Sequence, residues 1–173
     1  MKITDKMFAE MIDGRFAPKT PIVPNPKEDE ANIIAEILAA GYKLVDKTKF
    51  SAFPNSTTTY HGRIARSVGF AAKIVIDRVV IYRHESVHMY QRKKKGRHAF
   101  NAAYIFDRGF RLVSEVQADR EEARVLVAYG QKREILERWA KDQAMRYSKP
   151  PYFLFSTKKN RDVIEKALLH GIL

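Results

Sequence analysis

His84-Glu85-Ser86-Val87-His88 is the stretch that says most about how this chain folds. In an α-helix, residues four positions apart lie one above the other on the same face, so both imidazoles can reach one metal ion. Glu85 is rotated by about 100° from His84. It therefore reaches a water molecule in the open position of that metal, where it can act as a general base. The motif predicts a helix that carries two zinc ligands and one base.

The residues on both sides of this motif favour the same helix. Val80, Val87 and Gln91 recur with the two histidines at helical spacing and would share one face. Asp77 is a suitable N-cap residue, and Gly96 follows the polar end of the pattern as a helix stop. We expect one continuous helix between these two positions.

A second pair of residues supplies what the first motif lacks. Catalytic zinc sites usually have three protein ligands and a water molecule. Glu115 and Asp119 are again four residues apart and would lie on one helical face. A carboxylate at Glu115 can be the third ligand, and one at Asp119 can accept a hydrogen bond from the distal nitrogen of a ligand histidine.

His84-Glu85-x-x-His88 followed by Glu115-x-x-Ala118-Asp119 resembles the gluzincin zinc metallopeptidases, the thermolysin-like clan. The resemblance covers roughly residues 70–125. It implies a zincin-like fold and zinc-dependent hydrolysis of peptide bonds, with one Zn²⁺ per chain. The zinc ligands would be His84, His88 and Glu115; Glu85 would be the catalytic base and acid, and Asp119 would orient a histidine. The short length and the His88-x-x-Gln91 extension are also similar to small peptidases encoded by phages and bacteria.

Many gluzincins use a further Tyr or His to stabilise the tetrahedral oxyanion. No motif in this chain identifies that residue. The candidates for an oxyanion stabiliser are Tyr104, Tyr60, His61 and His98.

The composition limits the kind of site and the location of the protein. The 173 residues include no cysteine, so a metal must be held by His and carboxylate side chains, and the cysteine-liganded HExxH deformylase arrangement is excluded. There is no run of 18 apolar residues and no signal-peptide core near the N-terminus. We expect a cytoplasmic protein without a membrane segment, with association with a virion as an alternative.

The chain is strongly basic, with 32 Lys and Arg against 20 Asp and Glu and a formal net charge of +12. The densest basic run directly follows the metal-site helix and consists of Arg92, Lys93, Lys94, Lys95 and Arg97. Such a run is typical of a solvated helix end, and it could also contact nucleic acid or another polyanion. A protein or peptide substrate is the partner that the metal motif itself implies.

The remaining pattern predicts an α+β fold, mainly helical, with a small antiparallel or mixed sheet before the HExxH helix. Residues 1–27 form an N-terminal helix and a proline-rich arm, which could dock to a larger assembly, and residues 28–173 form the single zincin-like domain. We expect strands over 42–50, 57–68, 73–76 and 152–155, and helices over 4–13, 28–40, 100–106, 111–129, 132–147 and 160–169.

Two other hypotheses stay open at this stage. In one, His98 replaces Glu115 as the third ligand; this arrangement would be similar to the SprT-like proteases, which act on proteins attached to DNA. In the other, the chain is a structural or adaptor protein, such as a phage-particle component, that keeps a zinc site without turnover.

Overall fold

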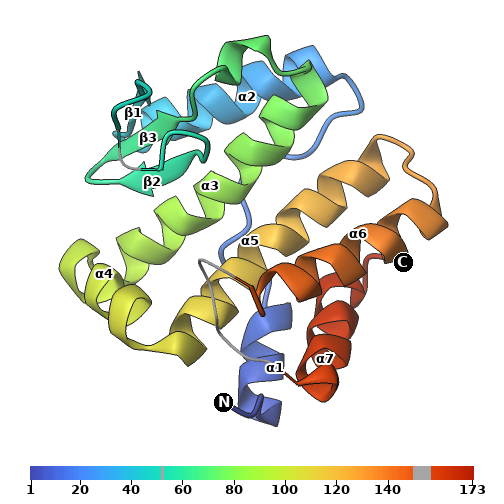
Figure 1. Cartoon of the computed structure of the whole chain (residues 1–173). Helices are drawn as coiled ribbons and strands as arrows, with labels where there is room; N and C mark the ends of the chain where they lie inside the picture. Colours follow the sequence, from blue (N-terminus) through green and yellow to red (C-terminus); the bar gives the residue numbers. More distant parts are fainter. Residues whose placement is uncertain (52, 150–156) are drawn as a thin grey trace.

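Two long helices, joined by a short one, form the centre of the molecule. The computed structural model describes residues 1–51, 53–149 and 157–173. Helix α3 (Val75–Lys95) and helix α5 (Arg108–Ala128) have 21 residues each and run antiparallel, with α4 (Arg97–Phe106) between them in sequence (Figure 1). The predicted N- and C-terminal halves of the metal site are therefore neighbours in space.

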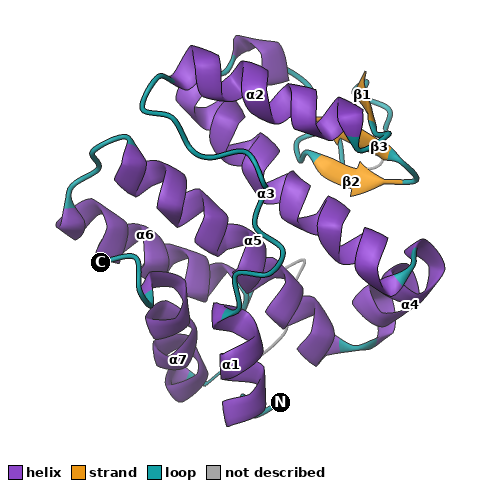
Figure 2. Ribbon diagram, turned by 180° about the vertical axis from the view of Figure 1, so that it is seen from behind, coloured by secondary structure: helices purple, strands orange, loops and turns teal. Residues whose placement is uncertain are grey.

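The other elements pack on either side of this central pair (Figure 2). On one side lie α2 (Pro26–Ala39) and a three-stranded sheet of β1 (Lys43–Asp46), β2 (Thr58–Tyr60) and β3 (Arg63–Arg66). On the other side lie α1 (Asp5–Ile12), α6 (Arg133–Arg146) and α7 (Lys158–Leu169). The α+β prediction is confirmed: the described chain is mainly helical with one small sheet.

The sheet is mixed and precedes α3. Its strand order is β1-β3-β2, with β1 parallel and β2 antiparallel to β3. The single strand predicted over 57–68 is a hairpin instead. His61 and Gly62 both have positive φ, 43° and 71°, which is the backbone of a two-residue type I′ turn.

Two further sequence predictions differ from the structure. The predicted strand over 73–76 is wrong, because Phe70–Ala72 form a 3₁₀ turn and α3 already begins at Val75. Ile74, not Asp77, is the N-cap residue of α3. Helix α5 begins at Arg108, since the Asp107 side chain accepts a hydrogen bond of 2.9 Å from the amide of Phe110 and caps it. The strand predicted over 152–155 lies outside the described residues.

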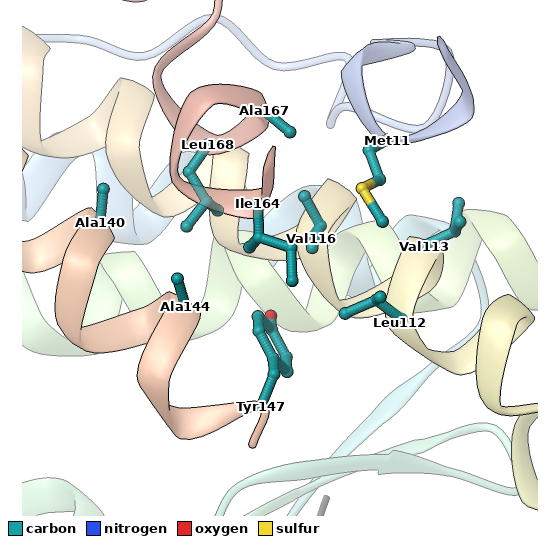
Figure 3. Packing of buried hydrophobic residues seen from close by; sticks show 10 residues of the cluster. All are labelled: Met11, Leu112, Val113, Val116, Ala140, Ala144, Tyr147, Ile164, Ala167 and Leu168. Atoms are coloured by element: carbon teal, nitrogen blue, oxygen red, sulfur yellow. The ribbon is translucent and has the colours of Figure 1, made fainter. Parts of the chain in front are cut away.

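Helix α1 belongs to the larger of two hydrophobic clusters. Met11 is fully buried and packs with Leu112 and Val116 of α5 and Ile164 of α7 (Figure 3). The second cluster lies between α2, β3 and α3. The central helices are thus held from both sides by apolar packing.

The proline-rich segment between α1 and α2 lies against the domain. Arg83 of α3 is buried and donates hydrogen bonds of 2.9 Å to the carbonyls of Thr20 and of Pro21. The Glu36 carboxylate of α2 accepts bonds of 2.8 Å from the amides of Lys19 and Thr20. Pro lacks an amide donor and has a restricted φ, which favours an extended path for this segment. The polar contacts with Arg83 and Glu36 hold it against α3 and α2.

Candidate metal centre

Three predicted ligands converge at the contact between α3 and α5. His84 and His88 lie one turn apart on α3, and their ring centroids are 5.0 Å apart. Glu115 of α5 faces both: one carboxylate oxygen is 3.3 Å from His88 Nε2, and the other is 4.0 Å from His84 Nε2. One ligand atom from each residue lies within 4.8 Å of the other two, so the three could hold a metal ion.

The separations fit the size of a zinc site. Zinc–nitrogen and zinc–oxygen bonds of about 2.0–2.1 Å in a tetrahedron place ligand atoms about 3.3–3.5 Å apart. The separations of 3.3 and 4.0 Å lie at or slightly above this value. Two imidazoles, one carboxylate and no thiolate also form a donor set that zinc accepts. The residues present therefore fit the metal that the motif predicts.

The orientation of the His88 ring follows from a chain of amide hydrogen bonds. The Gln91 side-chain nitrogen donates to the carbonyl of Ser114 at 3.1 Å and to Gln117 Oε1 at 2.8 Å. The Gln91 oxygen must then face His88 Nδ1, 2.8 Å away, and accept a hydrogen bond from its N–H. With the proton on Nδ1, a bound metal would be coordinated by the Nε2 lone pair, and without a metal Nε2 lies in contact with the Glu115 carboxylate.

His84 is placed by two carboxylates of α5. Its Nδ1 is 3.2 Å from Asp119 and 2.8 Å from Glu122. Neither contact has the alignment of a hydrogen bond, so the attraction is electrostatic. Asp119 is also fully buried and accepts bonds from Tyr147 Oη at 2.5 Å and from Arg146 at 3.0 Å. Asp119 therefore lies beside a ligand histidine as the sequence predicts, but it does not form the predicted hydrogen bond with that histidine.

Glu122 is a site residue that the sequence analysis missed. It lies seven residues after Glu115 and three after Asp119, on the same face of α5. This helical spacing is the feature of the sequence from which Glu122 could have been predicted to lie at the site. With His84 and Asp119 it forms a second group of possible metal ligands. Arg146 lies against Asp119 in this second group and opposes the binding of a cation there. The first group is therefore the better metal position.

The electrostatics of the site favour a bound cation. Burial disfavours the charged form of each ionisable side chain in the site. For Glu115, contact with His88 outweighs burial and holds the pKa of the side chain far below its usual range, so Glu115 is an ionised carboxylate. Burial also opposes protonation of His84, but Asp119 and Glu122 outweigh it and raise the pKa of His84 well above its usual value. Burial raises the pKa of Glu122. The protein thus concentrates anionic groups where a metal would replace protons.

A pocket of about 480 Å³ opens over these residues. Its walls come from α3, α4, α5 and the segment that includes β2. Glu85 lines this pocket beside the two histidines. Thr59 of β2 donates to Glu85 Oε2 at 2.7 Å and is also 3.1 Å from the Glu85 carbonyl. The second carboxylate oxygen, Oε1, has no hydrogen bond to any described residue and can take up a proton.

Of the four candidates for an oxyanion stabiliser, Tyr104 alone lines the described part of this pocket. Its hydroxyl donates to Glu115, and its ring contacts His88 edge to face with centroids 6.1 Å apart. Tyr60 and His61 lie exposed at the tight turn between β2 and β3. His98 is exposed near the start of α4. The structure therefore brings Glu115, rather than His98, to the two histidines.

The basic run divides into exposed and pocket-lining residues. Lys93, Lys94, Lys95 and Arg97 are exposed, and the two last lysines lie over the rings of Phe16 and Phe110. Arg92 lines the pocket instead. Arg92 is thus the least exposed side chain of this run and lines the pocket over the candidate metal ligands. The linear sequence does not indicate this difference between Arg92 and its neighbours.

Comparison with protein-family models, with curated proteins and with solved structures gives no match. None of the helices in the described ranges is both long and apolar enough to span a membrane.

Proposed function

We propose that the chain is a zinc-dependent peptidase of the gluzincin type with a zincin-like domain. The observation that carries the proposal is the convergence of His84, His88 and Glu115 on one side of a pocket that Glu85 also lines. The ligand set leaves the fourth position of a tetrahedral ion free, which distinguishes a catalytic from a structural zinc site.

A zinc ion held by these residues would act as a Lewis acid and bring the pKa of its water molecule close to neutrality. Glu85 would remove the proton of the attacking water through Oε1, since Thr59 already binds Oε2. Glu85 would then pass the proton to the leaving amine. Tyr104 lines the same pocket, and its single hydroxyl proton, which is donated to Glu115 in this structure, would have to turn from Glu115 to stabilise the developing oxyanion.

The sheet offers a way to hold an extended peptide. Strand β2 is an edge of the sheet, and Thr57, Thr58 and Thr59 line the pocket beside Glu85. An edge strand has backbone N–H and C=O groups that are free to pair with another extended chain. A substrate paired there would pass next to the metal ligands.

The decisive experiment compares Glu85→Gln with the unmodified protein. We expect the variant to keep about one zinc per chain and to lose cleavage of an unfolded substrate such as casein by about 100-fold or more, as removal of a general base typically does. Glu137→Gln is the control, because Glu137 is exposed and pairs with Arg133 on α6; zinc content and cleavage should not change.

Other outcomes would favour the alternatives. Full cleavage by Glu85→Gln would contradict the proposed base. Zinc without chelator-sensitive cleavage would favour a structural or adaptor protein, including a phage-particle component. Cleavage that requires DNA would favour a DNA-associated protease and a role for the exposed basic run.

A further inference from the structure

Helices α3 and α5 face each other, and their facing residues form levels that are one helical turn apart. His84 faces Asp119 and Glu122, and one turn along α3 His88 faces Glu115. The next level lies one more turn along. There α3 has Arg92, four residues after His88, and the antiparallel α5 has Arg111, four residues before Glu115. Both arginines line the same pocket as the metal ligands. Neither arginine at this level has a carboxylate partner among residues 1–51, 53–149 and 157–173.

The two guanidinium groups have unsatisfied donors. Arg92 Nε and Nη1 and Arg111 Nε are shielded from solvent and have no hydrogen-bond partner among the described residues. Neither arginine forms an ion pair within the described chain, whereas Arg78, Arg83 and Arg146 each pair with a carboxylate. Burial lowers the pKa of Arg92. Both arginines are half-buried, and unpaired charges of like sign that are partly shielded from water are costly, so this arrangement suggests a ligand that supplies an anion.

Aromatic rings of α4 support both side chains. The Arg92 guanidinium carbon is 5.1 Å from the centre of the Phe100 ring, and that of Arg111 is 6.0 Å from the centre of the Tyr104 ring. These two rings stack with centroids 5.7 Å apart and an interplanar angle of 22°. Cation–π contact limits the freedom of the guanidinium planes but satisfies no N–H donor. The two guanidinium groups are thus held in place while their shielded donors stay unsatisfied.

We propose that Arg92 and Arg111 bind a carboxylate of the substrate that lies within two residues of the scissile peptide bond. The proposal rests on the proposed peptidase function. Four residues of α-helix rise by about 6 Å, and each residue of an extended peptide spans about 3.3–3.6 Å. A carboxylate one or two residues from a carbonyl at the metal would therefore reach the arginine level. It can come from the C-terminus of a peptide or from an Asp or Glu side chain.

The test measures binding without turnover. Zinc-loaded Glu85→Gln protein is titrated against four fluorescent peptides of one sequence, which carry either a free or an amidated C-terminus and either Glu or Gln at an internal position. Fluorescence anisotropy gives each Kd. The peptides that keep the recognised carboxylate should bind at least about 10-fold more tightly than the doubly neutral peptide, as a charge-assisted hydrogen bond implies. The member that retains tight binding identifies the source of the carboxylate.

Variants connect this preference to the two arginines. Adding Arg92→Gln to the Glu85→Gln protein should remove the preference, while binding of the neutral peptide changes by less than about twofold. Arg111→Gln is the second variant, in case the first does not fold by circular dichroism. Arg97→Gln is the matched control, because it removes the same charge from an exposed position of the basic run. Equal binding of all four peptides, or an equal effect of Arg97→Gln, would overturn the proposal.

A separate measurement distinguishes failure of the subsite from failure of the peptidase proposal. Isothermal titration of succinate into the zinc-loaded protein should give binding that Arg92→Gln weakens by about 10-fold or more and Arg97→Gln does not. Succinate binding of this kind in a protein that cleaves no peptide would support the anion site and contradict the peptidase. Peptide cleavage with no anion preference and no succinate binding would support the peptidase and contradict the anion site.

Discussion

Substitution of Glu115 by Gln tests where the metal lies. The change keeps the volume of the side chain and an oxygen that can accept from Tyr104, but it removes the charge that faces both histidines. Apparent binding free energies of about 10–16 kcal/mol for structural zinc sites with four ligands correspond to about 3 kcal/mol per ligand. Since about 1.4 kcal/mol is a factor of ten in Kd, Glu115→Gln should weaken zinc binding by about 100-fold.

Glu122→Gln is the matched comparison, because it is the same change two turns further along the same helix face. Glu122 contacts His84 Nδ1, which is on the far side of the ring from the metal, and Asp119 remains 3.2 Å from that nitrogen. Changes to groups that only orient a ligand cost about 10–100-fold. With Asp119 in place, we expect about tenfold or less for Glu122→Gln.

Competition with a chromophoric zinc chelator gives both dissociation constants, and circular dichroism checks that each variant is folded. The order of the two effects is the decisive result. If Glu122→Gln weakened zinc binding more than Glu115→Gln, the metal would lie among His84, Asp119 and Glu122, and the proposed assignment of Glu115 as third ligand would be wrong.

Three further changes test the packing and the support of the site. Arg83→Met leaves the buried carboxylate of Asp29 without its ion-pair partner and should lower the free energy of unfolding in urea by about 3–5 kcal/mol. Arg133→Met breaks an exposed ion pair and should change the free energy of unfolding by less than about 1 kcal/mol; equal effects of the two substitutions would contradict the buried network. Met11→Ala should cost about 2–5 kcal/mol in thermal unfolding, because Met11 is fully buried; an unchanged Tm would show that α1 does not contribute to the core. Thr59→Val removes the donor to Glu85 and should lower kcat about 10-fold with zinc content unchanged; unaltered kcat would exclude that role.

Helices and their ends could be predicted where the determining signals are local. The spacing of apolar residues and the glycine at position 96 predict the end of α3, and the hairpin between β2 and β3 could have been found from His61-Gly62. The start of α3 could not, because its N-cap residue is Ile74, which has no capping side chain. There, packing of the helix on its neighbours outweighs the local preference.

The candidate metal site also combines features that are local in sequence with features that depend on residues far apart in the chain. Residues four apart on a helix share a face whatever surrounds them, so helical spacing is enough to pair His84 with His88 and Glu115 with Asp119. Their convergence depends on the antiparallel contact of α3 with α5, and these helices are held by two apolar clusters, one that joins α5 to α1, α6 and α7 and one that joins α3 to α2 and β3.

The partners of the charged side chains, in contrast, depend on how distant parts of the chain pack together. All four residues of the Arg92–Lys95 run are basic, yet Arg92 alone of these four lines the pocket over the candidate metal ligands, as Arg111 of α5 also does. Asp119 is held by Arg146 and Tyr147, about 27 residues away in sequence. Such pairings depend on burial and on the distance between elements that are far apart in the chain, because the energy of a charge is set by what surrounds it in space and not by its sequence neighbours.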